Sequence, residues 1–177
     1  MKKKLIIKIG TSTLTASTNR ISFAVIEGLA RQIVELKKEY DIVIVSSGAI
    51  ATARQFVESN GSIKTVDSKQ ALAAIGQTKL MEIYDVIFGT FGLNIAQILL
   101  TYRDFENSTA IENTRNTINR LWELNYIPVV NENDTVSFEE IVLGDNDKLS
   151  ALVATILEVD LLMLVSDIDG VFNKNPH

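Results

Sequence analysis

Short apolar runs alternate along this chain with longer segments in which apolar residues recur at every third or fourth position. The runs predict strands at Leu5–Ile9, Ile42–Val45, Leu93–Leu100, Ile127–Val130 and Leu161–Val165. The longer segments predict amphipathic helices at Phe23–Tyr40, Lys69–Phe91, Thr114–Leu124 and Lys148–Leu157, with a shorter helical stretch through Ala53 and Phe56. Helices that alternate regularly with strands predict an α/β fold, a three-layer αβα sandwich around a mostly parallel central sheet.

Small and polar residues follow four of the predicted strands. They are Lys8 and Gly10 at the first strand, Ser46, Ser47 and Gly48 after the second, Asn131–Asp134 after the fourth, and Ser166 and Asp167 after the fifth. The carboxyl ends of parallel strands meet at one edge of a sheet, where open sheets bind ligands. A lysine can pair with a phosphate there, and free backbone N–H groups in a small-residue turn bind anions. The pattern therefore predicts a single site for an anionic ligand.

The richest polar stretch runs from Asn131 to Ala151 and holds two clusters, at 131–134 and 145–147. Turn and helix-cap chemistry is enough to explain one such cluster, because short polar side chains favour those positions. A similarly plain explanation serves Lys8, as a side chain leaving a half-exposed strand, and Gly48, as part of a tight turn. Two clusters at the same edge of the sheet favour the ligand site.

Composition removes several classes of chemistry. The chain has 177 residues, 46% of them hydrophobic, which suits one globular domain. It has no cysteine, so disulfides and zinc–thiolate sites are excluded and a cytoplasmic location is expected. Its one histidine is His177, which excludes histidine-based triads and HExxH zinc sites. No set of metal-ligating residues is predicted.

Charge and hydropathy exclude two kinds of partner. The net charge of −5 argues against nucleic acid, because binding to phosphates needs an excess of lysine and arginine on the surface. The apolar run at Leu5–Ile7 is too short for a signal peptide, and no run approaches the length that spans a membrane. The motifs GxxxxGK[ST] and GxGxxG are absent, which excludes a P-loop and leaves a dinucleotide-binding fold without support.

Seven short motifs, spread over the whole chain, match a known family. They are KIGTSTLT at 8–15, VSSGAI at 45–50, KQALAAIGQ at 69–77, QILLT at 97–101, NENDTV at 131–136, GDNDKLSA at 144–151 and SDIDGVF at 166–172. Together they closely resemble the glutamate 5-kinases of the amino acid kinase family. The NEND and GDND motifs, in this order, are the part of the resemblance that points to the glutamate enzymes.

The resemblance implies the amino acid kinase fold and ATP-dependent phosphorylation of the side-chain carboxylate of L-glutamate, the first step of proline synthesis. ATP and Mg²⁺ are the expected cofactors, and L-glutamate is the expected substrate. Phosphoryl transfer depends mostly on positioning and charge stabilisation and needs no covalent intermediate. A chain without a usable histidine or cysteine is therefore suited to it.

The resemblance also assigns roles to residues at the matching positions. Catalysis falls to Lys8, which would stabilise the transferred phosphoryl group, and to Asp147, which would orient the catalytic lysines. Substrate binding falls to Ser47, Gly48, Asn131, Asp134 and Asn146, with Asp134 matching the amino group of glutamate by charge. ATP contacts fall to Lys8, Gly10, Ser166 and Asp167, and Gly10 and Gly48 would contribute backbone N–H groups.

Members of that family continue for several tens of residues past the position of His177, and that part carries the rest of the nucleotide site and a second catalytic lysine. The resemblance implies a single amino acid kinase domain at 1–177 that is truncated in its C-terminal nucleotide-binding part and lacks the RNA-binding-like domain of some relatives. The isolated chain is expected to turn over poorly or not at all. Two alternatives stay open: another amino acid kinase, or a catalytically incomplete fragment that binds glutamate or proline.

Two further expectations concern regulation and assembly. The resemblance implies feedback inhibition by proline, acting through the glutamate pocket. The apolar helix at 69–91 can serve an interface as easily as the core, and a homo-oligomer is expected.

Overall fold

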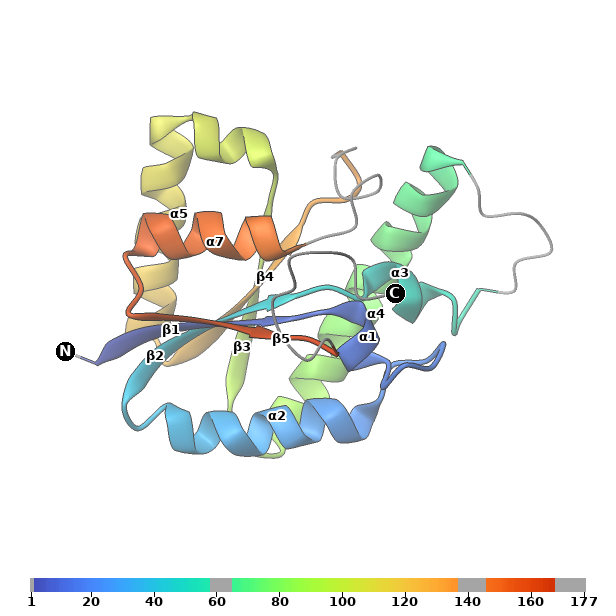
Figure 1. Ribbon diagram of the computed structural model, residues 1–177, viewed down its shortest axis with the longest axis horizontal. Helices are drawn as coiled ribbons and strands as arrows, with labels where there is room; N and C mark the ends of the chain where they lie inside the picture. The colour runs from blue at the N-terminus through green and yellow to red at the C-terminus, as the bar shows by residue number, and fades with distance from the viewer. Residues whose placement is uncertain (1, 58–64, 137–145, 168–177) are drawn as a thin grey trace, which may run out of the picture.

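A computed structural model describes residues 2–57, 65–136 and 146–167 (Figure 1). Five strands form one sheet in the order β3-β4-β2-β1-β5, and every neighbouring pair is parallel. The strands are β1 Lys3–Ile9, β2 Tyr40–Ser46, β3 Asn94–Leu100, β4 Tyr126–Glu132 and β5 Leu161–Val165. The predicted α/β fold and its five strands are confirmed.

Helices cover both faces of this sheet (Figure 1). Helices α2 (Phe23–Leu36) and α4 (Val66–Gly89) pack on one face, and α5 (Ser108–Glu123) and α7 (Asn146–Leu157) pack on the other. Side chains alternate along a strand, so β1 sends Leu5 and Ile7 into the core under α2 and α4, and Ile6 into the core under α7. The near-continuous apolar sequence of β1 follows from burial on both faces.

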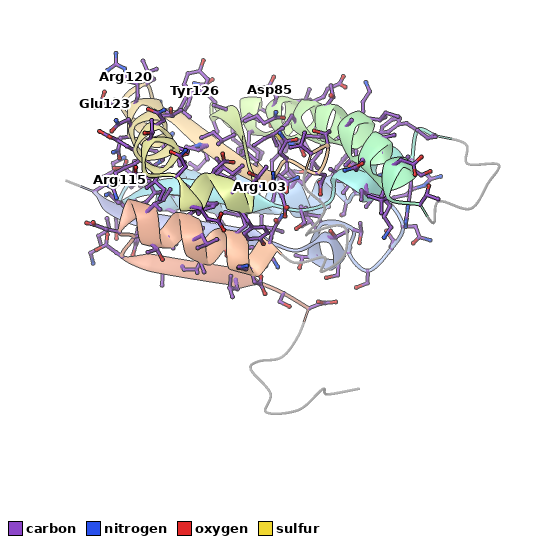
Figure 2. The ribbon with its side chains drawn as sticks, turned by 90° about the horizontal axis from the view of Figure 1, so that it is seen from above. Asp85, Arg103, Arg115, Arg120, Glu123 and Tyr126 are labelled. Atoms are coloured by element: carbon purple, nitrogen blue, oxygen red, sulfur yellow. The ribbon has the colours of Figure 1, made fainter. Side chains whose placement is uncertain are left out.

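A hydrogen bond connects α5 and α7, which cover the same face of the sheet. Arg115 on α5 donates from its Nε to the carbonyl oxygen of Ile156, 2.8 Å away, in the last turn of α7 (Figure 2). The carbonyl groups at the end of a helix have no partner within it and carry partial negative charge, which a guanidinium satisfies. This contact helps to fix α7, whose opposite end enters the site described below.

Three short helices complete the described elements. Helix α1 (Thr11–Leu14) follows β1 directly, α3 (Ala49–Ala53) follows the turn after β2, and a 3₁₀ helix spans Tyr102–Glu106. The pattern of apolar residues did not predict α1 or the 3₁₀ helix, since each lasts about one turn and shows no full period. None of the helices that the structure describes is both long and apolar enough to cross a lipid bilayer.

Several predicted boundaries move. Strand β4 runs on through Asn131 and Glu132, because these residues pair in register with Leu99 and Leu100 of β3. Helix α7 begins at Asn146, two residues earlier than predicted, and α2 ends at Leu36 because Tyr40 already belongs to β2. The predicted turns at 60–62 and 168–170, and Gly144 and Asp145 of the GDND motif, lie outside the described residues.

Candidate active site

The predicted site residues gather at the carboxyl edge of the sheet, on the right in Figure 1, where α1 and α3 start and the first turn of α7 arrives. Lys8 is the penultimate residue of β1, and Ser47 and Gly48 form the turn between β2 and α3. Asn131 is the penultimate residue of β4 and pairs with β3, and Asn146 is the first residue of α7. Segments more than a hundred residues apart in the sequence thus meet at one edge, as the sequence predicts.

Lys8 and Asp147 form an ion pair. The Nζ of Lys8 lies 2.5 Å from Oδ1 of Asp147, and the two side chains are 11% and 45% exposed. The lysine is therefore held among buried residues while the carboxylate reaches the solvent side of the pair. A charge-assisted contact of this kind fixes the direction of the ammonium group. The pairing brings together the two residues to which catalysis was assigned.

Gly10 leaves room beside this ammonium group. A Cβ at position 10 would lie 3.7 Å from the Nζ of Lys8 and 3.9 Å from the Oγ of Ser12, so any side chain there would fill the space above the lysine. Ser12 in turn donates to Oδ1 of Asp167 at 3.0 Å, which joins α1 to the segment after β5. The ammonium charge beside a position without a side chain suits a phosphoryl group.

A buried amide cluster joins Asn146, Asn131 and Ser47. The Nδ2 of Asn146 lies 2.9 Å from both the Oγ of Ser47 and the Oδ1 of Asn131, and 3.3 Å from the carbonyl oxygen of Ser46. Asn146 is fully buried, and its Oδ1 accepts no hydrogen bond from any residue that the structure describes. A buried acceptor without a partner is costly, so a ligand N–H or O–H is the group that would satisfy it.

Two glutamines extend the cluster and were not among the predicted site residues. Asn131 donates to Oε1 of Gln77 at 2.9 Å, and Gln77 donates to Oε1 of Gln97 at 3.1 Å. Gln77 lies on the buried face of α4, four residues after Ala73 and three before Leu80. A polar residue at helical spacing within an apolar face was the signal that could have identified it.

The acidic end of β4 borders a small cavity of about 300 Å³. Its walls include Gln77 and Gln97, together with Glu132 and Asp134, whose exposures are 1% and 9%. Two nearly buried carboxylates beside neutral amides favour a cationic group. An ammonium group matches this charge, which agrees with the predicted role of Asp134.

The backbone conformation at position 48 requires glycine. Its φ of +103° lies in the region that favours glycine, and a Cβ there would come within 3.2 Å of Leu14. The glycine of the SSG sequence is thus required by the backbone conformation as well as by the contact predicted for its N–H group. Ser166 and Asp167 follow β5 directly, and the hydrogen bond from Ser12 links Asp167 to the rest of the edge.

No group of three or more acidic or histidine side chains suited to a metal ion occurs within 2–57, 65–136 and 146–167. The geometry can therefore serve a cationic amino group at the end of β4 and an anionic group above Lys8.

Comparison with known proteins agrees with this geometry. The sequence profile described as "Amino acid kinase family" matches residues 3–177. The chain is 44% identical over 174 residues to a protein named glutamate 5-kinase from Caldanaerobacter subterraneus subsp. tengcongensis. It is 42% identical over 175 residues to one from Geobacter sp. strain M21, and 44% identical over 175 residues to one from Geobacter metallireducens. Each alignment covers 98% of this chain and 47% of the relative.

A solved structure shares the fold. The crystal structure of UMP kinase from Ureaplasma parvum superposes with a TM-score of 0.64, at 18% sequence identity, over 98% of this chain and 73% of that one. At this level of identity the likeness concerns the fold alone. The chain spans about half the length of the glutamate 5-kinases that it matches.

Proposed function

Because this chain belongs to the amino acid kinase family, we propose that the protein containing it is a glutamate 5-kinase. The reaction is transfer of the γ-phosphoryl group of ATP to the side-chain carboxylate of L-glutamate. Relatives named glutamate 5-kinase support the choice of substrate, at 42% to 44% identity over nearly the whole of this chain.

The observation that carries the proposal is the buried cluster of Asn131, Asn146 and Ser47, which a hydrogen bond from Asn131 joins to Gln77. Gln77 lines the same cavity as the carboxylate of Asp134. Glutamate presents an ammonium group and two carboxylates. Asp134 binds the ammonium group by charge. The hydroxyl of Ser47 and the side-chain amides of Asn131 and Asn146 bind the other polar atoms of glutamate, which are uncharged or anionic. The open Oδ1 of Asn146 accepts a hydrogen bond from the same ammonium group.

Catalysis follows from positioning and charge. The transferred phosphoryl group spreads negative charge over its oxygens as it moves, and a fixed cation aimed at those oxygens stabilises it. Lys8 supplies that cation, and Asp147 holds the ammonium group in place at 2.5 Å. The backbone N–H of Gly48 binds the same oxygens, whereas the N–H of Gly10 is donated to the carbonyl oxygen of Val165 at 3.5 Å. The absence of a side chain at position 10 gives the phosphoryl group access.

ATP binds along the side of the site formed by Lys8, Gly10, Ser166 and Asp167. Mg²⁺ bound to a nucleotide keeps several waters, so it would need few ligands from the protein. When bound, Mg²⁺ would neutralise the negative charge of the phosphates. No residue of the described segments is assigned to it.

We extend the proposal to domain, location, regulation and assembly as follows. Residues 1–177 form one amino acid kinase domain of a cytoplasmic protein, proline inhibits it by competing at the glutamate pocket, and the protein is a homo-oligomer. The apolar outer face of α4, where Val86 is 63% exposed, supports the assembly.

The test is a coupled ADP-release assay on the natural gene product with MgATP and a panel of acceptors. We expect turnover with L-glutamate and at least a hundredfold lower kcat/KM with acetylglutamate, aspartate, carbamate and UMP, since a site built for specific polar groups rejects ligands that lack them. Turnover with another acceptor of the panel in preference to glutamate would replace the proposed substrate.

A second proposal concerns residues 1–177 by themselves. Since this chain spans 47% of its glutamate 5-kinase relatives, it binds glutamate or proline with little or no turnover in isolation. Calorimetric titration of the 177-residue chain with each amino acid, beside the ADP-release assay, tests this. Robust ATP-dependent glutamyl phosphate formation by the isolated chain would contradict it.

A further inference from the structure

A hydrogen-bonded relay runs from the core helix α4 to the turn that follows β2. The hydroxyl oxygens of Tyr84 and Ser46 lie 3.0 Å apart, and the Oγ of Ser46 lies 3.0 Å from the carbonyl oxygen of Ser47. Tyr84 and Ser46 are both fully buried. The relay therefore links a helix in one covering layer to the backbone of a turn at the sheet edge.

The direction of each hydrogen bond in the relay is determined. A carbonyl oxygen can only accept, so the single hydroxyl hydrogen of Ser46 is donated to Ser47. Ser46 must then accept from the hydroxyl of Tyr84. Removal of the tyrosine hydroxyl would leave Ser46 without its donor and would loosen its hold on the Ser47 carbonyl.

This carbonyl shares a planar peptide unit with the N–H of Gly48. In a trans peptide the two groups point in opposite directions, so fixing the Ser47 oxygen toward the Ser46 hydroxyl aims the Gly48 N–H away from it. Across the described segments, no acceptor is found for the Gly48 N–H. Its left-handed φ of +103° makes the orientation of this peptide specific to the turn.

Two further contacts hold the same turn. Asn146 on α7 approaches the Ser46 carbonyl oxygen at 3.3 Å and the Ser47 hydroxyl at 2.9 Å, from the other covering layer. On the face of the sheet that α4 covers, α4 lies so close to α3 that a Cβ on Gly76 would come within 1.7 Å of the Ala49 oxygen. The turn is thus clamped between helices of both layers, and Tyr84 is the contact that acts on the peptide plane.

We propose that Tyr84 and Ser46 are positioning residues that aim the Gly48 N–H at the phosphoryl group in transfer. The inference rests on the proposed function and deepens it, because neither residue touches the substrate. Both act through one peptide unit. A donor aimed at an oxyanion is worth a large factor in kcat, and a donor that is held less firmly loses part of that factor.

The kinetic test compares Tyr84→Phe, Ser46→Ala and the double variant in the natural gene product. We expect each single variant to lower kcat by about tenfold, less than the 10²–10³ found when an oxyanion donor is removed outright. KM for glutamate should change less than about twofold, since glutamate binds to other groups. The double variant should match the single variants, because both changes break the same relay.

A matched control separates the relay from packing. Phe88 stacks edge-to-face on Tyr84 with ring centroids 5.5 Å apart and takes no part in the relay. Phe88→Leu should lower the melting temperature by at least as much as Tyr84→Phe, yet leave kcat within about twofold below that temperature. If Phe88→Leu and Tyr84→Phe lower kcat alike, Tyr84 serves packing only and the proposal fails.

A second measurement does not depend on the identity of the acceptor. With ¹⁵N-glycine labelling, titration with inorganic phosphate should move the Gly48 amide resonance in the wild type and in Phe88→Leu. The movement should be at least halved in Tyr84→Phe and Ser46→Ala. An equal response in all four proteins would overturn the proposal, whereas a wild type without glutamate-dependent turnover would overturn the proposed function alone.

Discussion

Lys8 is the side chain whose surroundings constrain the chemistry most closely. It belongs to β1, lies beside Gly10 and is paired with Asp147 at 2.5 Å. Lys4, four residues earlier on the same strand, donates instead to the carbonyl oxygen of Leu157 at 2.8 Å, at the far end of the sheet. One strand therefore carries a lysine suited to catalysis and a lysine that serves structure.

This contrast gives a first prediction. Lys8→Ala should lower kcat by at least about a hundredfold, because it removes the cation that stabilises the phosphoryl group. Lys8→Arg should restore little of the loss, since a planar guanidinium cannot take the place of a compact ammonium group. Lys4→Ala is the control: its melting temperature should fall while its kcat stays near that of the wild type. A Lys8→Ala enzyme with nearly normal kcat would remove Lys8 from the mechanism.

Asp134 gives a second prediction, which concerns binding. Asp134→Ala should raise KM for glutamate by about tenfold or more and leave KM for ATP within about twofold, because the proposed role of this carboxylate is to bind the amino group of glutamate and not the nucleotide. Asp85→Ala makes the same change of charge at an exposed residue of α4 (Figure 2) and should alter neither constant. Equal weakening of glutamate and ATP by Asp134→Ala would point to misfolding.

Tyr84 gives a third prediction, which concerns pH. Burial raises the pKa of Tyr84 to about 12. Its ordinary value is about 10. As pH rises, the unfolded chain therefore loses this proton before the folded chain does. The contribution of Tyr84 to the free energy of unfolding is fully present below about pH 10, and the free energy of unfolding falls by about 2 to 3 kcal/mol as pH rises toward 12.

Urea unfolding between pH 9 and 12 measures this loss. Tyr84→Phe should be less stable than the wild type at pH 9 by about 1 kcal/mol, for the missing hydrogen bond, and should show a smaller decline at higher pH. Tyr40→Phe should keep the full decline, since it leaves Tyr84 in place. Parallel curves for the wild type and Tyr84→Phe would contradict the assignment.

At the scale of elements, the contact between α3 and α4 is the closest in the molecule's described part. A Cβ on Gly76 would lie 1.7 Å from the carbonyl oxygen of Ala49 and 2.9 Å from the backbone nitrogen of Ala53. Neither backbone atom can yield as the end of a flexible side chain would. The glycine therefore sets the distance between the helix that carries Gln77 and Tyr84 and the helix that begins after Gly48.

A fourth prediction follows for this contact. Gly76→Ala should destabilise the protein by about 1 to 3 kcal/mol or more through overpacking and should also lower kcat, because α4 must move away from the turn. Gly28→Ala is the matched control. Its Cβ would meet no atom within 4 Å in the middle of α2, so it should be neutral or slightly stabilising. Chemical unfolding of both variants gives the comparison, and equal stability would show that α4 adapts without cost.

At the scale of the whole molecule, β5 places apolar side chains at the edge of the sheet. It lies at one end of the sheet order and pairs with β1. Three of its apolar residues are substantially exposed: Leu161 by 43%, Met163 by 41% and Leu164 by 49%. An apolar strand at the edge of the sheet that the described residues form is a surface on which further chain can pair.

The fifth prediction tests this surface in the isolated 177-residue chain. Its apparent mass in light scattering should rise with concentration, and Leu164→Lys should reduce the rise, because a charged edge discourages pairing. Val136→Lys adds the same charge at a residue that is 70% exposed and outside the sheet, and should have little effect. A reduction by both variants alike would assign the effect to net charge.

Much of this molecule follows from its sequence by local physical rules. Apolar runs such as Ile42–Val45 and the periodic helices predict a parallel α/β sandwich, because burial on two faces needs continuous apolar strands and each crossover needs a helix. Parallel strands place their carboxyl ends together, which is why Lys8, Ser47 and Asn131 could be expected at one edge. The lack of cysteine and of an internal histidine limits the chemistry equally firmly.

Only the tertiary structure decided which of these groups touch. That Lys8 pairs with Asp147, that Asn146 binds both Ser47 and Asn131, and that Tyr84 reaches Ser46 depend on how α7 and α4 lie across the sheet. The amide chain through Gln77 and Gln97 arises in the same way. Local patterns record which face of an element is buried, but the partner across that face is set by packing between segments distant in the sequence.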